Sequence, residues 1–300
     1  MKHTALRSVL ATASALMMLA AGSAWAGQLD DIKAAGAISF GTEGNYAPYT
    51  YHDEKGTLTG YDVEVGREIA KKLGVKAEFR ETLWDGMIAG LDAKRFDVVI
   101  NQVTPTPARL EKYLFSVPYT YNYGAVLVHK DNQDIKNFAD VKGKLVASSL
   151  TSNWNATAQK LGAKIVEVTD GSGAFLLVSQ KRADAALNSQ LALADFIKKQ
   201  PNAPVKVVGR SDEAIESAVM IRKGSDDLKA AVDKALDELR AEGKLKELSV
   251  KFFGIDVSSK QYSRLVLTTL KSNTPSSLSS IKTHHVRREG RVAPQRQRFF

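Results

Sequence analysis

Short apolar runs alternate with amphipathic segments along most of the chain, from about residue 29 to residue 257. A continuous or alternating apolar run of about four to eight residues predicts a strand, and apolar positions that recur at helical spacing predict a helix. Glycines such as Gly74 and Gly243 follow the predicted helices and end them. Strands and helices that alternate in this way are typical of an α/β protein with mostly parallel sheets.

The same pattern places the individual elements, beginning with a short amphipathic helix near Leu29. It predicts strands over residues 37–41, 75–80, 98–100, 119–130, 144–148, 164–168, 184–187, 205–208 and 218–221. It predicts further helices over residues 62–73, 83–92, 108–113, 155–161, 174–181, 191–199, 226–242 and 245–253.

One predicted strand ends in a cluster of polar side chains. Residues 98–100 are apolar, and residues 101–109 read Asn-Gln-Val-Thr-Pro-Thr-Pro-Ala-Arg, with two prolines that stop the strand. In an open α/β sheet, ligands bind just past the carboxyl ends of the strands. Arg109 has the planar guanidinium that forms paired hydrogen bonds with a carboxylate. A solvated loop with an ordinary surface arginine is the alternative interpretation.

A second segment repeats part of this stretch. Residues 94–101 (Lys-Arg-Phe-Asp-Val-Val-Ile-Asn) match residues 181–188 (Lys-Arg-Ala-Asp-Ala-Ala-Leu-Asn), and each follows a predicted helix and ends a predicted strand. The simplest interpretation is two lobes of similar design, although a chance match of this length is the alternative. With two lobes, the cleft between them is the expected ligand site.

Composition narrows the chemistry. Hydrophobic residues make up 44% and charged residues 25% of the 300-residue chain, which is ordinary for a globular protein. The absence of cysteine excludes disulfides, thiolate metal sites, a cysteine nucleophile and a lipoprotein anchor. The five histidines show no metal-ligand spacing in the body of the chain. We therefore predict neither a metal nor a cofactor.

The formal net charge of +9 comes from the two ends of the chain. Residues 27–257 contain 31 basic and 32 acidic residues, whereas residues 258–300 contain nine basic residues and one acid. The nearly neutral body gives no reason to expect nucleic acid or an anionic membrane as a partner. We expect the protein to be a monomer.

The first 26 residues have the three parts of a secretory signal peptide. Lys2 and Arg7 form a positive start, an apolar run extends over residues 9–21, and residues 24–26 (Ala-Trp-Ala) form a small-x-small cleavage site. The apolar run is too short for a membrane-spanning helix. We expect cleavage near Ala26 and Gly27 and a mature protein in the periplasm.

Three segments resemble a known family. Residues 60–70 (Gly-Tyr-Asp-Val-Glu-Val-Gly-Arg-Glu-Ile-Ala) resemble the signature of the family 3 solute-binding proteins, which are periplasmic receptors of polar-amino-acid ABC importers. Residues 84–88 (Trp-Asp-Gly-Met-Ile) and 43–46 (Glu-Gly-Asn-Tyr) are similar to the L-cystine-binding branch of that family. The resemblance extends over residues 29–257.

The resemblance implies a two-lobe type II periplasmic binding protein fold, the hinged "Venus flytrap" in which closure buries the ligand. Each lobe would be a mostly parallel sheet flanked by helices. Lobe 1 would comprise residues 27–119 and 217–257, and lobe 2 residues 120–216. The chain would cross between the lobes near residues 119–121 and 216–218. The implied partners are a small polar amino acid and an inner-membrane ABC permease.

The resemblance also implies roles for individual residues. Arg109 would bind the α-carboxylate of the ligand, assisted by Thr104 and by the backbone of Gln102. Ser152 and the neighbouring amides at the start of a helix would close on the same carboxylate. The implied ligand-binding residues are Glu43, Tyr46, Trp84, Asn101, Gln102, Val103, Thr104, Arg109, Thr151, Ser152, Asn153 and Ser189.

Two aromatic residues and one acid in this set have other possible roles. Trp84 lies in a predicted apolar helix, where a tryptophan commonly packs in the core, but the family resemblance favours a wall of the side-chain pocket, together with Tyr46. Glu43 would bind a second ammonium group, such as the one that cystine carries, or would be a surface acid. Trp154 could cap lobe 2 or line the pocket.

One position departs from the family pattern. These receptors normally place an aspartate where this sequence has Ser189, and that aspartate pairs with the α-ammonium of the ligand. A neutral hydroxyl loses a charge-assisted hydrogen bond, which is about twice as strong as a neutral one. Either Glu43 or Asn188 replaces that contact, or the ligand is a carboxylate that lacks an α-amine.

An enzyme on the same fold is the alternative from another functional class. The periplasmic cyclohexadienyl dehydratases share the fold and need a general acid in the cleft, for which Glu43 is the obvious candidate. The sequence offers no set of nucleophile, base and orienting residue. A binding protein without catalytic residues is therefore the preferred interpretation.

The chain continues past the end that is usual for the family. Residues 258–300 are rich in Ser, Thr and Arg and have no sustained helical or strand period. A basic arm for a membrane or an acidic partner is one interpretation. We prefer a disordered and dispensable extension.

Overall fold

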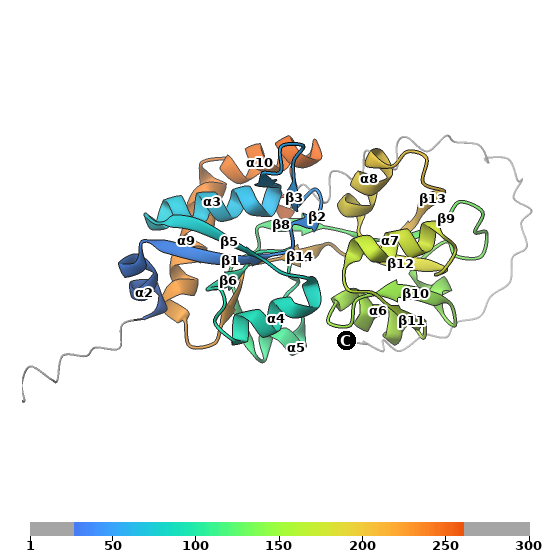
Figure 1. Cartoon of the computed structure of the whole chain (residues 1–300), viewed down its shortest axis with the longest axis horizontal. Coiled ribbons are helices and arrows are strands. Elements are labelled where there is room, and N and C mark those ends of the chain that lie inside the picture. The colour runs from blue at the N-terminus through green and yellow to red at the C-terminus, as the bar shows by residue number, and fades with distance from the viewer. Residues whose placement is uncertain (1–26, 261–300) are drawn as a thin grey trace, which may run out of the picture. The chain divides into compact units, whose positions relative to one another are not determined.

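The computed structural model describes residues 27–260, and Figure 1 labels their helices and strands. The predicted signal peptide and residues 261–300 of the predicted tail lie outside the described residues. Two five-stranded sheets form the framework. The first has the order β5 (Lys76–Glu81), β1 (Ala37–Thr42), β6 (Val98–Val99), β15 (Met220–Arg222) and β7 (Tyr113–Phe115). The second has the order β11 (Lys164–Glu167), β10 (Leu145–Ser148), β12 (Ala185–Ser189), β9 (Gly124–His129) and β13 (Val205–Arg210).

The two sheets share one design. In the first, β1 pairs in parallel with β5 and β6, and the antiparallel strands β15 and β7 follow. In the second, β10 pairs in parallel with β11 and β12, and the antiparallel strands β9 and β13 follow. The predicted α/β fold of two sheet-bearing lobes is therefore confirmed.

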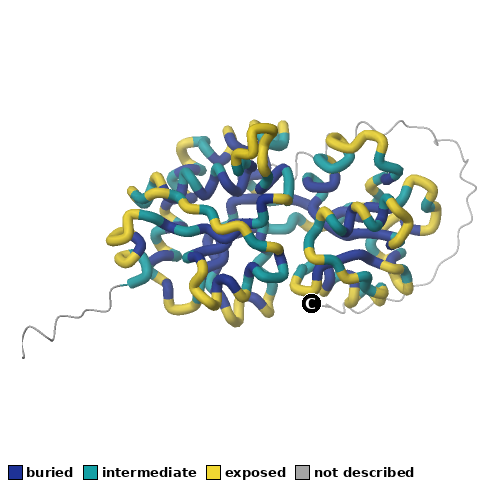
Figure 2. Tube along the Cα trace, viewed as in Figure 1, coloured by how far each residue is buried: buried dark blue, intermediate teal, exposed yellow. Residues whose placement is uncertain are grey.

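Helices accompany both sheets because each strand needs apolar cover on its faces. Strands β9 and β12 are buried almost throughout, as Figure 2 shows for the central strands. The helices before the first crossover are α2 (Gln28–Ala35), α3 (Tyr61–Leu73), α4 (Trp84–Asp92) and α5 (Pro107–Leu110). Those after it are η2 (Phe138–Val141), α6 (Asn153–Lys160), α7 (Gly171–Ser179), α8 (Gln190–Lys199), α9 (Asp226–Ala241) and α10 (Lys244–Phe253).

Two short strands carry the chain from one sheet to the other. Strands β8 (Thr120–Asn122) and β14 (Ile215–Ser217) pair in antiparallel register, with Thr120 opposite Ser217. They contain the segments at which the sequence predicts the crossovers, while the exact lobe boundaries stay a prediction. A small sheet of β2 (Asn45–Tyr46), β3 (Thr50–His52) and β4 (Leu58–Thr59) lies between β1 and α3 in the chain.

The internal repeat has a structural counterpart in both sheets. Lys94 and Lys181, the first residue of each copy, adopt left-handed conformations with φ of 57° and 58°. The aspartate of each copy then joins the neighbouring strand through its carboxylate: the backbone N–H of Ser39 donates to Asp97 Oδ2 and that of Leu145 to Asp184 Oδ2, each at 2.8 Å. The repeat therefore marks the same turn from helix to strand in both sheets.

Three predicted elements differ from the structure. The predicted helix over 108–113 ends at Leu110, because residues 113–115 form strand β7 against β15. The predicted strand over 119–130 is two strands, β8 and β9, separated by Tyr123. In the strand predicted over 98–100, only Val98 and Val99 are in the ladder, although Ile100 is buried. Pairing between distant segments decides all three, and local patterns do not contain it.

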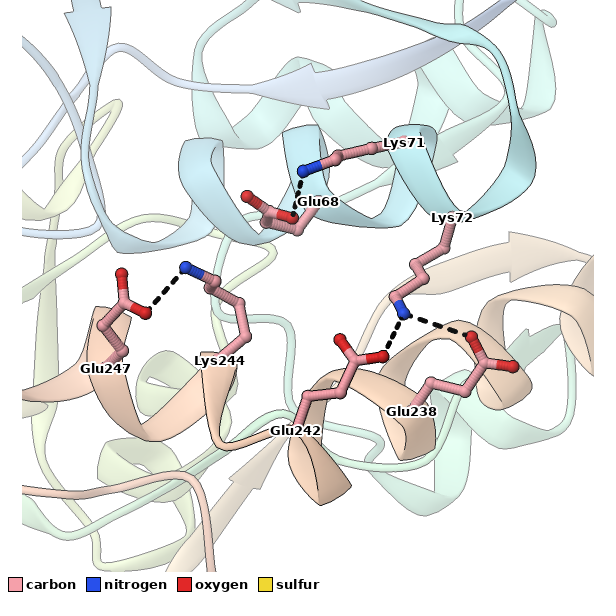
Figure 3. Close-up of polar contacts among 7 residues, drawn as sticks. All are labelled: Glu68, Lys71, Lys72, Glu238, Glu242, Lys244 and Glu247. Atoms are coloured by element: carbon pink, nitrogen blue, oxygen red, sulfur yellow. Dashed lines mark hydrogen bonds and ion pairs between the residues drawn. The ribbon is translucent and has the colours of Figure 1, made fainter.

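Charged side chains join the helices α3, α9 and α10 on their solvent-facing sides (Figure 3). Lys72 of α3 contacts Glu242 at 2.5 Å and Glu238 at 3.4 Å, and Lys244 contacts Glu247 at 2.6 Å. Exposed pairs of this kind contribute little to stability. The apolar sides of these helices, including buried Ile69 of α3 and Leu236 of α9, therefore hold them together. No helix within residues 27–260 is long and apolar enough to span a bilayer.

The residue before α3 gives a test of this framework. Gly60 has φ of 125° and ψ of 169°, a conformation that is essentially restricted to glycine, and an added Cβ would lie 2.2 Å from the carbonyl oxygen of Tyr49. We expect Gly60→Ala to lower the free energy of unfolding by about 3 kcal/mol in urea titrations. Gly56→Ala is the control, because Gly56 has a positive φ of 75° but no atom within 4 Å of an added Cβ. A loss no larger than that of the control would contradict the description of this turn.

Candidate functional site

A cavity of about 490 Å³ lies where strands of both sheets end. Glu43 follows β1, Asn101 and Gln102 follow β6, Ser148 ends β10, and Asn188 lies in the last turn of β12. The carboxyl ends of parallel strands are where open α/β sheets bind ligands. The residues that line the cavity are Glu43, Tyr46, Trp84, Asn101, Gln102, Ala147, Ser148, Ser149, Ser152, Asn153, Trp154, Asp170, Gly171, Ala174, Leu187 and Asn188.

Glu43 presents an unsatisfied carboxylate oxygen in this cavity. Its Oε2 atom accepts a hydrogen bond of 2.6 Å from Asn101 Nδ2, and Asn101 Oδ1 accepts the backbone N–H of Glu43 at 3.0 Å. Its Oε1 atom is buried and has no partner among the described residues. Burial raises the pKa of Glu43 to about 7, the bond from Asn101 opposes that rise, and the nearby carboxylates of Asp170 and Asp85 add to it. A buried acceptor without a partner is costly, so this oxygen favours a ligand that donates to it.

Two aromatic side chains complete the wall around Glu43. The buried Nε1 atom of Trp84 also has no hydrogen-bond partner within the described residues, so the cavity offers a donor as well as an acceptor. Tyr46 donates from its hydroxyl to Asn188 Oδ1 at 2.7 Å, and this bond joins the two sheets across the cavity. An apolar wall with a few unsatisfied polar atoms is typical of a small-molecule site.

Arg109 lies beside this cavity and does not line it. Its guanidinium donates to the carbonyl oxygens of Thr104 and Thr151, each at 2.9 Å, and lies 5.4 Å from the ring centroid of Trp84. The side chain lines an adjacent groove that also contains Lys112 and Lys160. Burial lowers the pKa of Arg109 to about 10, so the group stays charged at neutral pH.

The residues at the start of α6 divide between the two hollows. Ser152 is the N-cap of the helix, and its hydroxyl accepts the backbone N–H of Trp154 at 3.1 Å. Ser152 and Asn153 line both the cavity and the groove, whereas Thr151 lines only the groove. Asp85 of α4 accepts hydrogen bonds from Thr151, at 3.0 Å from the backbone N–H and at 2.7 Å from the hydroxyl.

Ser189 does not line the main cavity. Its hydroxyl lies 2.7 Å from the hydroxyl of Tyr49 and also contacts Asn122 Nδ2, and all three residues are buried. Ser189 also caps α8, because its hydroxyl accepts the backbone N–H of Ala192. The hydroxyl is therefore engaged by protein groups from both sheets, in a small pocket next to the cavity.

The structure thus brings together seven of the twelve residues predicted for the site. Val103 is separate from the cavity because its side chain is in the core, with 1% exposed, and its carbonyl accepts the N–H of Ala218. Thr104 lines the groove and the small pocket. The residues predicted for the site that line the cavity are Glu43, Tyr46, Trp84, Asn101, Gln102, Ser152 and Asn153.

The sequence prediction missed Asp170, the second acid of the cavity. Asp170 caps α7 by accepting the N–H of Gly173 at 2.8 Å, and its Oδ2 accepts from Asn45 Nδ2 at 3.3 Å. Ser148, Ser149 and Asn188 were also absent from the predicted site. Each follows or ends a strand, and this position was the available signal. Trp154, which the sequence left open between capping lobe 2 and lining the pocket, lines it.

The arrangement separates charges along the site. Glu43 and Asp170 place two carboxylates in the cavity, whereas Arg109, Lys112 and Lys160 place three cationic groups around the groove. Such a site favours a zwitterion with its ammonium toward the cavity and its carboxylate toward Arg109. Within residues 27–260, no group of three or more metal-ligating side chains is placed to hold a metal ion.

Comparisons with known proteins agree on one family. Residues 38–255 match the model for bacterial extracellular solute-binding proteins, family 3. The L-cystine-binding protein TcyA of Bacillus subtilis is 47% identical over 238 residues, which cover 79% of this chain and 87% of that protein.

Two solved structures are similar as well. The L-cystine solute receptor of Neisseria gonorrhoeae, in its unliganded open conformation, is 47% identical with a TM-score of 0.54, over 78% of this chain and 100% of that one. An ancestral arginine-binding protein bound to arginine is 35% identical with a TM-score of 0.69, over 73% of this chain and 98% of that one.

The environment of Glu43 predicts how stability depends on pH. The folded state holds a proton on Glu43 up to about pH 7, whereas the ordinary value is 4.5, so stability falls as pH rises through that window. We expect Glu43→Gln to remove about 2 kcal/mol of this loss between pH 5 and pH 8, measured by urea unfolding at both pH values. Asp62 keeps a raised pKa of about 7 in both proteins, so only the difference between them reports on Glu43. Equal losses in the two proteins would contradict the assignment.

Proposed function

The chain belongs to family 3 of the bacterial extracellular solute-binding proteins, and from this premise we propose that it is a periplasmic receptor for a polar amino acid. L-cystine is the best candidate ligand, and an inner-membrane ABC permease is the partner that receives it. The predicted signal peptide supports the periplasmic location. The observation that carries the proposal is the unpartnered oxygen of Glu43 in a cavity between the two sheets.

Glu43 supplies the recognition of the ligand's ammonium group. An ammonium donates hydrogen bonds, and the only buried side-chain acceptor without a partner among the described residues is Glu43 Oε1. Asp170 adds a second negative charge to the same cavity. Ser189 is a poor alternative, because Tyr49, Asn122 and the N-terminus of α8 already engage its hydroxyl.

Arg109 supplies the recognition of a carboxylate at the other end. A guanidinium has five N–H donors, and two hydrogen bonds to carbonyls leave others free for an anion. Thr104 and Ser152 lie along the same groove and offer a hydroxyl and the start of a helix. A ligand with its ammonium at Glu43 would therefore reach Arg109 past Ser152 and Asn153, which line both hollows.

Contacts across the cavity support a closed arrangement of the two lobes. Thr151 is held on its carbonyl by Arg109 and on its amide and hydroxyl by Asp85. On the other side, Asn45 contacts Asp170 and accepts the hydroxyl of Ser172 at 2.9 Å. The comparisons support the same view, because the open gonococcal receptor has the higher identity but the lower TM-score. Ligand binding followed by closure would form these contacts.

Cystine matches this distribution of charge because it has an ammonium and a carboxylate at each end. Glu43 and Asp170 can receive its ammonium groups, and the cationic groove can receive a carboxylate. The proteins named for L-cystine among the relatives favour it over other zwitterions. The similar TcyA is named as a binding protein, which favours a receptor over an enzyme of the dehydratase type.

Calorimetric titration of the purified protein with a short panel of ligands tests the proposal. The panel contains L-cystine, L-arginine, L-glutamine and 3,3′-dithiodipropionate, which keeps the carboxylates and disulfide of cystine but lacks its amines. We expect L-cystine to bind most tightly and Arg109→Ala to weaken it by about 100-fold, because a partly buried charge pair is lost. Arg80→Ala is the matched control, since Arg80 contacts only the exposed Glu78. Binding of the amine-free compound alone would overturn the amino-acid assignment.

A further inference from the structure

Asp62 is a buried carboxylate whose hydrogen bonds go to the binding strand and not to its own helix. It lies in the first turn of α3 and has no exposed surface. Its Oδ2 accepts the backbone N–H of Gln102 at 2.8 Å, and its Oδ1 accepts the side-chain amide of the same residue at 2.7 Å. One aspartate thus engages both polar groups of one residue of the cavity wall.

Gln102 has a backbone conformation that needs such support. Its φ is 52°, in the left-handed region that side chains other than glycine rarely adopt. It directly follows Asn101, whose amide holds the carboxylate of Glu43. The turn at Gln102 therefore sets the direction in which the end of β6 presents Asn101 to the cavity.

The same residue reaches the strand that crosses between the sheets. The side-chain amide of Gln102 donates to Thr120 Oγ1 at 3.1 Å, and its backbone N–H lies 3.2 Å from the hydroxyl of Tyr119. Tyr61, beside Asp62 in α3, donates its hydroxyl to the carbonyl of Tyr119 at 2.8 Å. The start of α3, the end of β6 and the start of β8 are thereby joined in one buried network.

We propose that Asp62 is a positioning residue for the ligand site: its carboxylate holds Gln102 in the left-handed conformation and so fixes the Asn101–Glu43 pair relative to the crossing strand β8. Asp62 does not line the cavity and acts through Gln102. The consequence for ligand affinity rests on the proposed function, whereas the consequence for the backbone at Gln102 does not.

Four variants separate this role from a general contribution to the core. Asp62→Asn replaces one acceptor oxygen by an amide nitrogen that faces a donor of Gln102. Gln102→Gly removes the conformational demand, because glycine adopts positive φ without a steric penalty. The double variant combines the two. Asp97→Asn is the control: Asp97 lies just before the other end of β6 and also accepts a backbone N–H, that of Ser39 at 2.8 Å, far from the cavity in sequence and contacts.

Calorimetry with L-cystine gives the first readout. We expect Asp62→Asn to weaken binding by about tenfold, the loss of roughly one hydrogen bond to a charged group. Asp97→Asn should leave the affinity unchanged. The double variant should bind no more weakly than Gln102→Gly alone, because the glycine no longer needs the carboxylate. A double variant whose loss equals the product of the two single losses would show that Asp62 does not act through Gln102.

Amide hydrogen exchange in the ligand-free protein gives the second readout. We expect Asp62→Asn to speed exchange at residues 101–103 relative to the wild type and to Asp97→Asn. Unchanged exchange there would overturn the proposal whether or not cystine binds. If the wild type binds no amino acid while Asp62→Asn speeds exchange at these residues, the proposed function fails and the positioning role of Asp62 stands.

Discussion

A buried carboxylate with one satisfied oxygen and one free oxygen is the constraint on which the site depends. Glu43 is held by Asn101 at the end of β6, and its other oxygen has no partner among the described residues. Burial of this group opposes its ionisation and raises its pKa to about 7. The protein accepts that cost at one point only if a ligand donor can offset it. Asp62, through Gln102, keeps the supporting strand end in place.

The two sheets make this arrangement possible because they repeat one design. Each has three parallel strands followed by an antiparallel pair, and each begins its central repeat with a left-handed lysine. The strand ends of both sheets carry asparagine, Asn101 in one and Asn188 in the other, and each asparagine engages a side chain of the 43–46 segment. That segment is therefore read from both sides, which is how a site between two lobes senses closure.

Much of this could be predicted from the sequence, and the reasons for the failures are physical. Alternating strands and helices follow from apolar periodicity, and the repeat at 94–101 and 181–188 indicated two similar sheets. Strand β7 was assigned to a helix because its pairing with β15 is not a local property. Asp170 was missed because a helix-capping aspartate has an ordinary local explanation. The direction of Arg109, which contacts two carbonyls beside the cavity, depends on packing that the sequence does not specify.

The most direct test of this account is the pH dependence of the affinity for L-cystine. If the ligand's ammonium pairs with ionised Glu43, the dissociation constant should fall by up to about tenfold per unit as pH rises from 5 toward 7, and level off above the pKa of about 7. In Glu43→Gln the dependence should be flat over the same range, with weaker binding at pH 8. A wild-type affinity that does not change between pH 5 and pH 8, or an equal slope in the variant, would contradict the central role of Glu43.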